Sequence, residues 1–183
     1  MEKLNIVGSW PALVTPFNDN NEVDYDILRN LIDFQVENGS NGILLLGSTS
    51  EATLLSQSER IKIIDESLAA SKNRVSALVG VSASTTKLTI ENARYAKDAG
   101  ADGGLIVQPG YIKPSQEAIY GYFKDVAEAV DLPLVIYNNP SRTGVNVEAE
   151  TVARLARLEN IVALKEAGPN PYGVLRVVEL TRG

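Results

Sequence analysis

Short runs of apolar residues alternate along the chain with longer segments in which apolar residues recur every three or four positions. Nearly every position in a short run is apolar, which is typical of strands buried on both faces of a parallel sheet. We predict strands at residues 12–14, 43–46, 75–79, 105–107, 134–136 and 161–164. The strands follow one another at intervals of about 30 residues, as βαβ units require.

The segments between these runs carry the sequence signals of helices. We predict that the first helix begins after Asp24 and ends at Asn38-Gly39, because glycine commonly follows a last helical turn. The second begins at Ser56, which forms an S-x-x-E capping box with Glu59. Further helices are predicted over residues 86–99, 115–130 and 147–158, and a last one starts near Pro171.

The predicted order is β-α five times, then a strand and a helix, which fits a doubly wound open sheet or a (β/α)8 barrel. A doubly wound nucleotide-binding sheet carries a glycine-rich phosphate loop after an early strand. Residues 47–50, Gly-Ser-Thr-Ser, match no such loop. Polar residues at several strand ends favour the barrel, where catalytic groups lie at the carboxyl ends of strands. The sequence therefore predicts an α/β chain, a (β/α)8 TIM barrel with only its first six strands present.

The length of the chain changes this picture. Its 183 residues fall short of the ~250 that eight βα units typically need, and no stretch of sequence resembles an interdomain linker. We expect residues 1–183 to form a single domain, a partial barrel that ends within the sixth helix. An open sheet of six strands exposes apolar edges, so we expect the chain by itself to be unstable or to associate through them.

Composition and charge narrow the possible chemistry. The chain contains no His and no Cys, which excludes a Ser-His-Asp triad, a histidine- or thiolate-bound metal and a thiol nucleophile. The net charge of -6 argues against a nucleic acid partner. No run approaches the ~18 apolar residues of a membrane span, and the first residues lack the basic-then-apolar order of a signal peptide. We therefore expect a cytoplasmic protein.

The residues at the predicted strand ends carry the candidate chemistry. Lys165 ends the last strand, and a lysine removed from water can act as a neutral nucleophile in Schiff-base chemistry. Tyr137 ends the strand before it and is a candidate acid or base. Ser48 and Thr49 follow the second strand, where hydroxyls and backbone N–H groups can bind a carboxylate. Arg142 can bind a carboxylate through two parallel hydrogen bonds.

Each of these residues also has an ordinary structural interpretation. Lys165 can pair with Glu166 in solvent, Tyr137 can pack at the rim, and the remaining residues can serve in turns, caps or loops. Taken together, however, the residue types suit a keto-acid site. An amine would attack the carbonyl, hydroxyls would bind the carboxylate, and a phenol would carry the proton.

Four stretches of sequence carry a resemblance to a known family. They are Gly-Ser-Thr-Ser-Glu at 47–51, Tyr-Asn-Asn-Pro-Ser-Arg-Thr-Gly at 137–144, Ala-Leu-Lys-Glu-Ala at 163–167 and Pro-Ala-Leu-Val-Thr-Pro-Phe at 11–17. In order and spacing, the chain resembles the dihydrodipicolinate synthase (4-hydroxy-tetrahydrodipicolinate synthase) family of class I pyruvate-dependent aldolases and lyases. The resemblance implies a (β/α)8 barrel lyase that condenses pyruvate with L-aspartate 4-semialdehyde, the entry step to diaminopimelate and lysine.

The resemblance also implies catalytic roles. Lys165 matches the Schiff-base lysine, Tyr137 matches the tyrosine that relays protons, and Ser48 matches the hydroxyl beside it, which is normally a threonine. Tyr111 matches the tyrosine that reaches into a neighbouring subunit's site. A homo-oligomer is therefore expected, and a homotetramer in the full-length family.

The same resemblance assigns the substrate contacts. Thr49 matches the contact to the pyruvate carboxylate, and Arg142 matches the arginine that binds the semialdehyde carboxylate. We expect no metal and no organic cofactor, because the protonated imine on the lysine is itself the electron sink.

The sequence departs from the family pattern at three positions, and the first of them leaves the acceptor open. Ser48 replaces the usual threonine, Gly110 stands where the synthases often carry a tyrosine, and Ser50 stands where glycine is typical. Glycine at position 50 would permit a positive φ or close ligand approach, so Ser50 can alter the pyruvate pocket. Gly-Ser-Thr also occurs in the related N-acetylneuraminate lyases. That activity, a 2-keto-3-deoxy-sugar-acid aldolase and a catalytically inactive barrel fragment are the alternatives.

Overall fold

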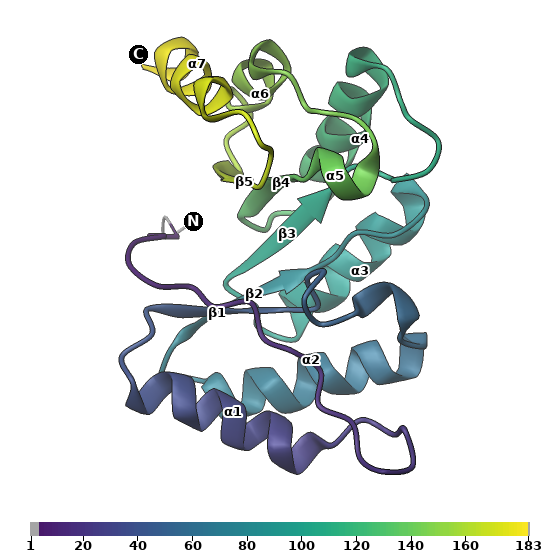
Figure 1. Cartoon of the computed structure of the whole chain (residues 1–183), viewed down its shortest axis with the longest axis vertical. Coiled ribbons are helices and arrows are strands. Elements are labelled where there is room, and N and C mark those ends of the chain that lie inside the picture. Colours follow the sequence, from purple (N-terminus) through teal and green to yellow (C-terminus); the bar gives the residue numbers. More distant parts are fainter. Residues whose placement is uncertain (1–3, 183) are drawn as a thin grey trace. The chain divides into compact units, whose positions relative to one another are not determined.

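The computed structural model describes residues 4–182, and its sheet contains five strands (Figure 1). They are β1 (Gly42–Leu45), β2 (Ser76–Gly80), β3 (Gly103–Val107), β4 (Leu134–Asn138) and β5 (Ile161–Glu166), hydrogen-bonded to one another in chain order. β1 pairs with β2 and β4 with β5 in parallel. The structure therefore confirms the five apolar runs from residue 43 onward as strands.

The six predicted helices are present. They are α1 (Tyr25–Glu37), α2 (Gln57–Ser71), α3 (Thr86–Asp98), α4 (Gln116–Ala129), α6 (Ala149–Leu155) and α7 (Pro171–Thr181). Asp24 caps α1, and the predicted capping box of Ser56 and Glu59 opens α2. The structure adds a 3-10 helix, η1 (Ala52–Leu54), and a four-residue helix, α5 (Pro140–Thr143). Both are too short to show a helical period. No helix within residues 4–182 has the length and apolarity needed to cross a membrane.

The first predicted strand, at residues 12–14, is reduced to a single parallel bridge between Ala12 and Leu44. Two backbone hydrogen bonds of 2.9 Å support it, from Leu13 N to Leu44 O and from Leu44 N to Pro11 O. Pro11 has no N–H to donate, and the side chain of Val14 is half-exposed. The segment therefore lies beside β1 without forming a regular ladder.

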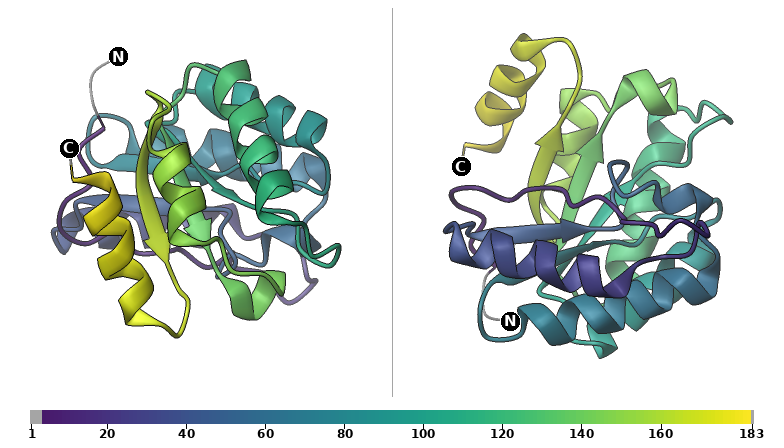
Figure 2. Two further views of the ribbon diagram at one scale, coloured as in Figure 1. Left: turned by 90° about the horizontal axis from the view of Figure 1, so that it is seen from above. Right: turned by 60° about the horizontal axis from the view of Figure 1, so that its bottom comes forward.

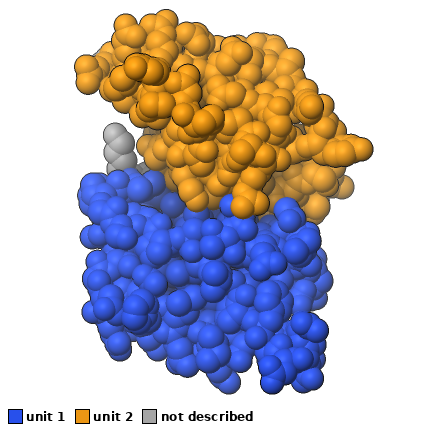
Figure 3. Space-filling view, in the orientation of Figure 1, with its two compact units in different colours: residues 1–80, 95–104 blue, residues 81–94, 105–183 orange. Residues whose placement is uncertain are grey.

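The chain divides into two compact units (Figure 3). Unit 1 comprises residues 1–80 and 95–104, and in it α1 and α2 lie side by side (Figures 1 and 2). Unit 2 comprises residues 81–94 and 105–183 and contains β4, whose five residues are all buried. The side chains of Leu28 and Ile32 lie in the core of unit 1, and Ile119 and Phe123 of α4 lie in that of unit 2. The single domain remains a prediction.

A cluster of buried hydroxyl groups ties the carboxyl end of β3 to α4 within unit 2. The Tyr122 hydroxyl lies 3.0 Å from Thr89 Oγ1, and Ser82 Oγ accepts a 2.7 Å hydrogen bond from Val107 N. Burial raises the pKa of the Tyr122 phenol above its ordinary value of 10.0, although hydrogen bonds to Thr89 and Ser82 act in the opposite direction. The protonated phenol is thus the form that the folded chain favours.

β5 is the least buried strand of unit 2, and α7 is its least buried helix. Every residue of β5 is only partly buried, and no residue of α7 is buried. α7 lies beside α6 (Figure 2) and leaves several apolar side chains exposed, namely Tyr172, Val174, Leu175, Val178 and Leu180. Because β5 also ends the sheet, it presents unpaired backbone groups beside an apolar helix.

We expect Tyr122 to make the chain less stable in alkali. Its pKa is higher in the folded than in the unfolded chain. The stability it contributes is therefore complete below the unfolded pKa of about 10 and is lost as pH rises through the folded pKa. In Tyr122→Phe, the free energy of unfolding should fall less steeply between about pH 9 and about pH 11 than in the wild type, as measured by urea denaturation. An equally steep fall in both proteins would contradict this assignment.

We also expect the isolated chain to associate through β5 and α7, because an open strand edge and exposed apolar side chains favour pairing. Sedimentation velocity should show a species larger than the monomer that grows with concentration. Leu175→Lys should shift it toward monomer, whereas Leu54→Lys, which changes an even more exposed leucine in unit 1, should not. A concentration-independent monomer with one sharp thermal transition would show that the edge is inert.

Candidate active site

Tyr137 and Lys165 lie opposite each other on neighbouring parallel strands of unit 2. The register pairs Tyr137 of β4 with Lys165 of β5, and Asn138 with Glu166. Successive side chains of a strand point to opposite faces, so Tyr137 and Lys165 share one face. Lys165 Nζ lies 4.4 Å from the centre of the Tyr137 ring, a cation–π contact. The structure thus brings together the predicted nucleophile and the predicted proton carrier.

An irregularity in β5 sets this register. Leu134 pairs with Ile161, but the next residue, Val135, pairs with Ala163, so Val162 is an extra residue in the ladder. Such a β-bulge shifts every later pair by one position. Without it, Tyr137 would face Leu164 instead of Lys165.

The carboxylate of Glu166 is engaged on the other face of the strands. It accepts a 2.8 Å hydrogen bond from Asn138 Nδ2 and another from Gly168 N. The alternative in which Lys165 simply pairs with its neighbour Glu166 is therefore not the arrangement seen, because the strand directs the two side chains to opposite faces.

The phenol of Tyr137 is buried, and its oxygen accepts a 2.7 Å hydrogen bond from Asn139 Nδ2. Ser141 Oγ in turn donates to Asn139 Oδ1 at 2.7 Å. The phenol is therefore held in one orientation by side chains two and four residues further along the chain. Asn139 lies inside the matched stretch at 137–144, but its residue type alone did not mark it as a candidate.

Arg142 lies on α5, the short helix that follows β4. Pro140 opens this helix, and Gly144 ends it with a positive φ of 78°, the usual chemistry of a first and a last helical position. Asn139 O accepts hydrogen bonds of 3.0 Å from the N–H groups of Arg142 and Thr143. The Arg142 side chain itself is exposed, so its guanidinium can reach a carboxylate that arrives from solvent.

Gln108, the residue after β3, donates hydrogen bonds to the turn that carries Arg142. Its Nε2 donates to Thr143 Oγ1 at 3.1 Å and to Val145 O at 2.8 Å. The side chain is 1% exposed, and among the described residues its Oε1 has no hydrogen-bond partner. Its position directly after an apolar run is the signal that could have marked it as a site residue.

Ser48 and Thr49 belong to unit 1, where they occupy the turn between β1 and η1. Thr49 is exposed and Ser48 partly so. Two buried hydrogen bonds clamp the turn to the first segment of the chain: Thr15 Oγ1 donates to Ser50 O at 2.7 Å, and Ser50 Oγ donates to Leu13 O at 2.8 Å. The turn that carries both hydroxyls is therefore fixed at its base.

Ser50 does not adopt the conformation expected of a glycine at its position. Left-handed φ angles occur instead at Leu46, with φ 53°, and at Glu51, with φ 55°. The Ser50 hydroxyl is directed at the Leu13 carbonyl, so this departure from the family pattern serves to clamp the turn.

Tyr111 stands apart from the other candidate residues of unit 2. It lies in the loop between β3 and α4 with a φ of 68°, and its side chain is 98% exposed. Lys113 is also left-handed, and Ile112 between them is exposed. The loop thus presents a phenol and an aliphatic side chain to solvent.

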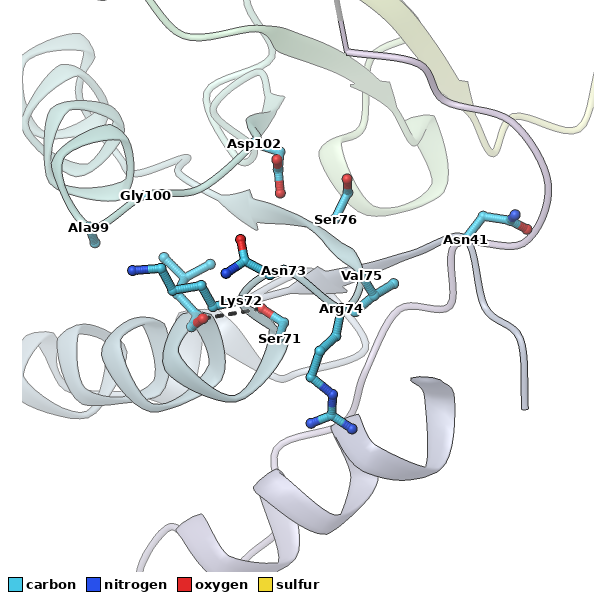
Figure 4. A pocket seen from close by; sticks show the side chains of 11 residues that line it. Asn41, Ser71, Lys72, Asn73, Arg74, Val75, Ser76, Ala99, Gly100 and Asp102 are labelled. Carbon is cyan, nitrogen blue, oxygen red and sulfur yellow. Dashed lines mark hydrogen bonds between the residues drawn. The ribbon is translucent and has the colours of Figure 1, made fainter. Parts of the chain in front are cut away.

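A polar pocket lies at the opposite, amino ends of the strands of unit 1 (Figure 4). Asn41 precedes β1, Ser76 begins β2 and Asp102 precedes β3, and residues 71–75, at and after the end of α2, also line the pocket. Asp102 Oδ2 accepts a 2.7 Å hydrogen bond from Ala77 N. In barrels the amino ends of strands serve stability, so we do not assign this pocket to the active site.

Comparison with known proteins supports the resemblance read from the strand ends. The chain is 48% identical over 160 residues to the 4-hydroxy-tetrahydrodipicolinate synthase of Pelobacter propionicus and 45% identical over 160 residues to that of Syntrophobacter fumaroxidans. Each match covers 87% of this chain and 55% of the relative. The chain therefore spans little more than half the length of these curated relatives.

Solved structures of relatives match the fold closely. Dihydrodipicolinate synthase from Aquifex aeolicus superposes with a TM-score of 0.91 at 42% identity, over 94% of this chain and 59% of that one. The enzyme from Acinetobacter baumannii, complexed with pyruvate, gives a TM-score of 0.95 at 39% identity, over 98% and 62%. These matches confirm the predicted α/β barrel class. The model of the dihydrodipicolinate synthetase family matches residues 5–182, and the chain belongs to that family.

Proposed function

We propose that this chain carries the pyruvate-activating residues of a 4-hydroxy-tetrahydrodipicolinate synthase. The observation that carries the proposal is the pairing of Lys165 with Tyr137 at the carboxyl ends of β4 and β5. Its substrates are pyruvate and L-aspartate 4-semialdehyde, and its pathway is that of diaminopimelate and lysine. Relatives with 40–48% identity that bear this enzyme name support the assignment.

The chemistry follows from the two side chains. The neutral amine of Lys165 adds to the keto carbon of pyruvate, and loss of water leaves a protonated imine. The imine draws electrons from the adjacent methyl group, which releases a proton and becomes the carbon of an enamine. That carbon attacks the aldehyde carbon of the semialdehyde, whose oxygen takes up a proton. Tyr137, on the same face as Lys165, carries these protons.

Three further residues take part in the proposed reaction. Thr49 binds the carboxylate of pyruvate, and Ser48 supplies a hydroxyl to the proton relay. Arg142 binds the carboxylate of the semialdehyde, a role that its exposed guanidinium on a well-held turn supports. The imine accepts the electrons, so the proposed reaction needs no metal or organic cofactor.

We propose that the complete enzyme is a cytoplasmic homo-oligomer, a tetramer, in which Tyr111 enters the site of a neighbouring subunit. The near-complete exposure of Tyr111 and the exposed Ile112 beside it support this role, because large apolar side chains at a loop tip favour a partner surface. One solved relative is described as the first monomeric dihydrodipicolinate synthase variant.

The Schiff base gives the most direct test. Incubation with pyruvate and borohydride should attach a reduced pyruvyl group to Lys165, located by peptide mass spectrometry. Lys165→Arg should abolish the adduct because a guanidinium stays protonated and is no nucleophile. Lys124→Arg, which changes an exposed lysine on α4, should leave the adduct unchanged. A folded wild-type chain that forms no adduct would refute the mechanism.

An acceptor screen then separates the synthase from its alternatives. We expect turnover with L-aspartate 4-semialdehyde and little with N-acetylmannosamine or with the aldehydes of sugar-acid aldolases. The reverse preference would assign the chain to one of those reactions. An adduct on Lys165 without turnover of any acceptor would support the inactive fragment.

A further inference from the structure

We propose that Asn139 is a positioning residue that makes Tyr137 a better proton donor and couples it to the Arg142 turn. The inference rests on the proposed function, since it assigns Tyr137 the proton transfer. Asn139 and Tyr137 are both more than nine-tenths buried, and the amide donates to the phenol oxygen at 2.7 Å. Ser141 Oγ holds the other end of the amide at 2.7 Å.

The direction of this hydrogen bond determines its chemical effect. The amide N–H donates to a lone pair of the phenol oxygen. The phenol is therefore the acceptor in this contact, and its own O–H is not the donor. A donor aimed at an oxygen that becomes negative favours the ionised form, and it does so more strongly where water is excluded. Tyr137 therefore releases its proton more readily than it would beside an apolar residue.

The backbone of Asn139 acts on a second part of the site. Its carbonyl accepts hydrogen bonds of 3.0 Å from Arg142 N, Thr143 N and Thr143 Oγ1. The side chain thus orients the phenol while the main chain fixes the turn that carries the guanidinium. An apolar residue at this position keeps the backbone bonds and loses the two side-chain contacts, to the phenol and to Ser141 Oγ, so substitution separates the effect on the phenol from the effect on the turn.

The neighbouring Asn138 shows that a buried amide here need not face the site. Its Nδ2 donates to Asn146 Oδ1 and Glu166 Oε2, and its Oδ1 accepts from Val147 N. These contacts lie on the face opposite Tyr137 and Lys165. Of two adjacent buried asparagines, Asn139 is the one that touches the proton carrier.

The experiment follows the exchange of pyruvate methyl protons for deuterium by NMR, with borohydride adduct formation measured on the same samples. Exchange reports enamine formation and needs no aldehyde. In Asn139→Val we expect an unchanged adduct yield, exchange slowed about tenfold, and a pH profile displaced upward by about one unit. Asn139→Asp, which keeps the shape but lacks the donor and adds negative charge, should displace the profile at least as far.

A matched control separates this effect from loss of stability. Asn160 is also buried in unit 2, and it donates to the carbonyls of Ala127, Val130 and Leu132. Asn160→Ser should lower the melting temperature and leave the pH profile of exchange in place.

The outcomes distinguish failure of the proposed function from failure of the role proposed for Asn139. No adduct in the wild type would overturn the proposed function itself. An adduct with exchange rates and pH profiles equal in the wild type and Asn139→Val would overturn only the role of Asn139. A profile displaced to lower pH would also overturn it, because the phenol would then be donating to the amide. An ultraviolet difference titration against Tyr137→Phe variants gives a readout of the phenol that does not depend on catalysis, and it should show the same upward displacement.

Discussion

The bulge at Val162 is the constraint on which the candidate site depends. It inserts one residue into β5 between the Leu134–Ile161 and Val135–Ala163 pairs, and by doing so it brings Lys165 opposite Tyr137. A shift of one residue in a strand exchanges its two faces. Without the bulge, the amine would face away from the phenol and toward Asn138. The local irregularity therefore decides whether the proposed nucleophile and the proposed proton carrier meet.

Hydrogen bonds on both faces of the strands then hold the arrangement. On one face Asn139 fixes the Tyr137 phenol, and on the other Asn138 and Glu166 bond to each other across β4 and β5. A buried hydrogen bond contributes about 1 kcal/mol net, whereas leaving one partner unsatisfied costs about 1–3 kcal/mol. A shift in the register of either strand would leave these buried polar side chains without partners. The same hydrogen bonds therefore fix the register of the site and stabilise unit 2.

Most of the strands and helices and two of the site residues could be predicted from the sequence. The bulge and the role of Asn139 could not, for physical reasons. Apolar runs and capping residues located the strands and helices, and the positions of Tyr137 and Lys165 after apolar runs marked them as candidates. The sequence does not indicate the bulge. The residues from Ile161 to Leu164 are all apolar, so their pattern does not show which face of the strand each side chain occupies. The role of Asn139 depends on the direction of a side-chain amide, which no pattern of residue types reveals.

Lys165, the proposed nucleophile, lies on the least buried strand of unit 2, and this links the proposed chemistry to the open edge. Schiff-base formation needs a neutral amine, which exclusion of water favours. Yet every residue of β5 is only partly buried, while the neighbouring β4 is buried throughout. A partner surface packed against β5 would therefore have two effects. It would remove an apolar edge from water, and it would enclose the amine that the proposed mechanism uses.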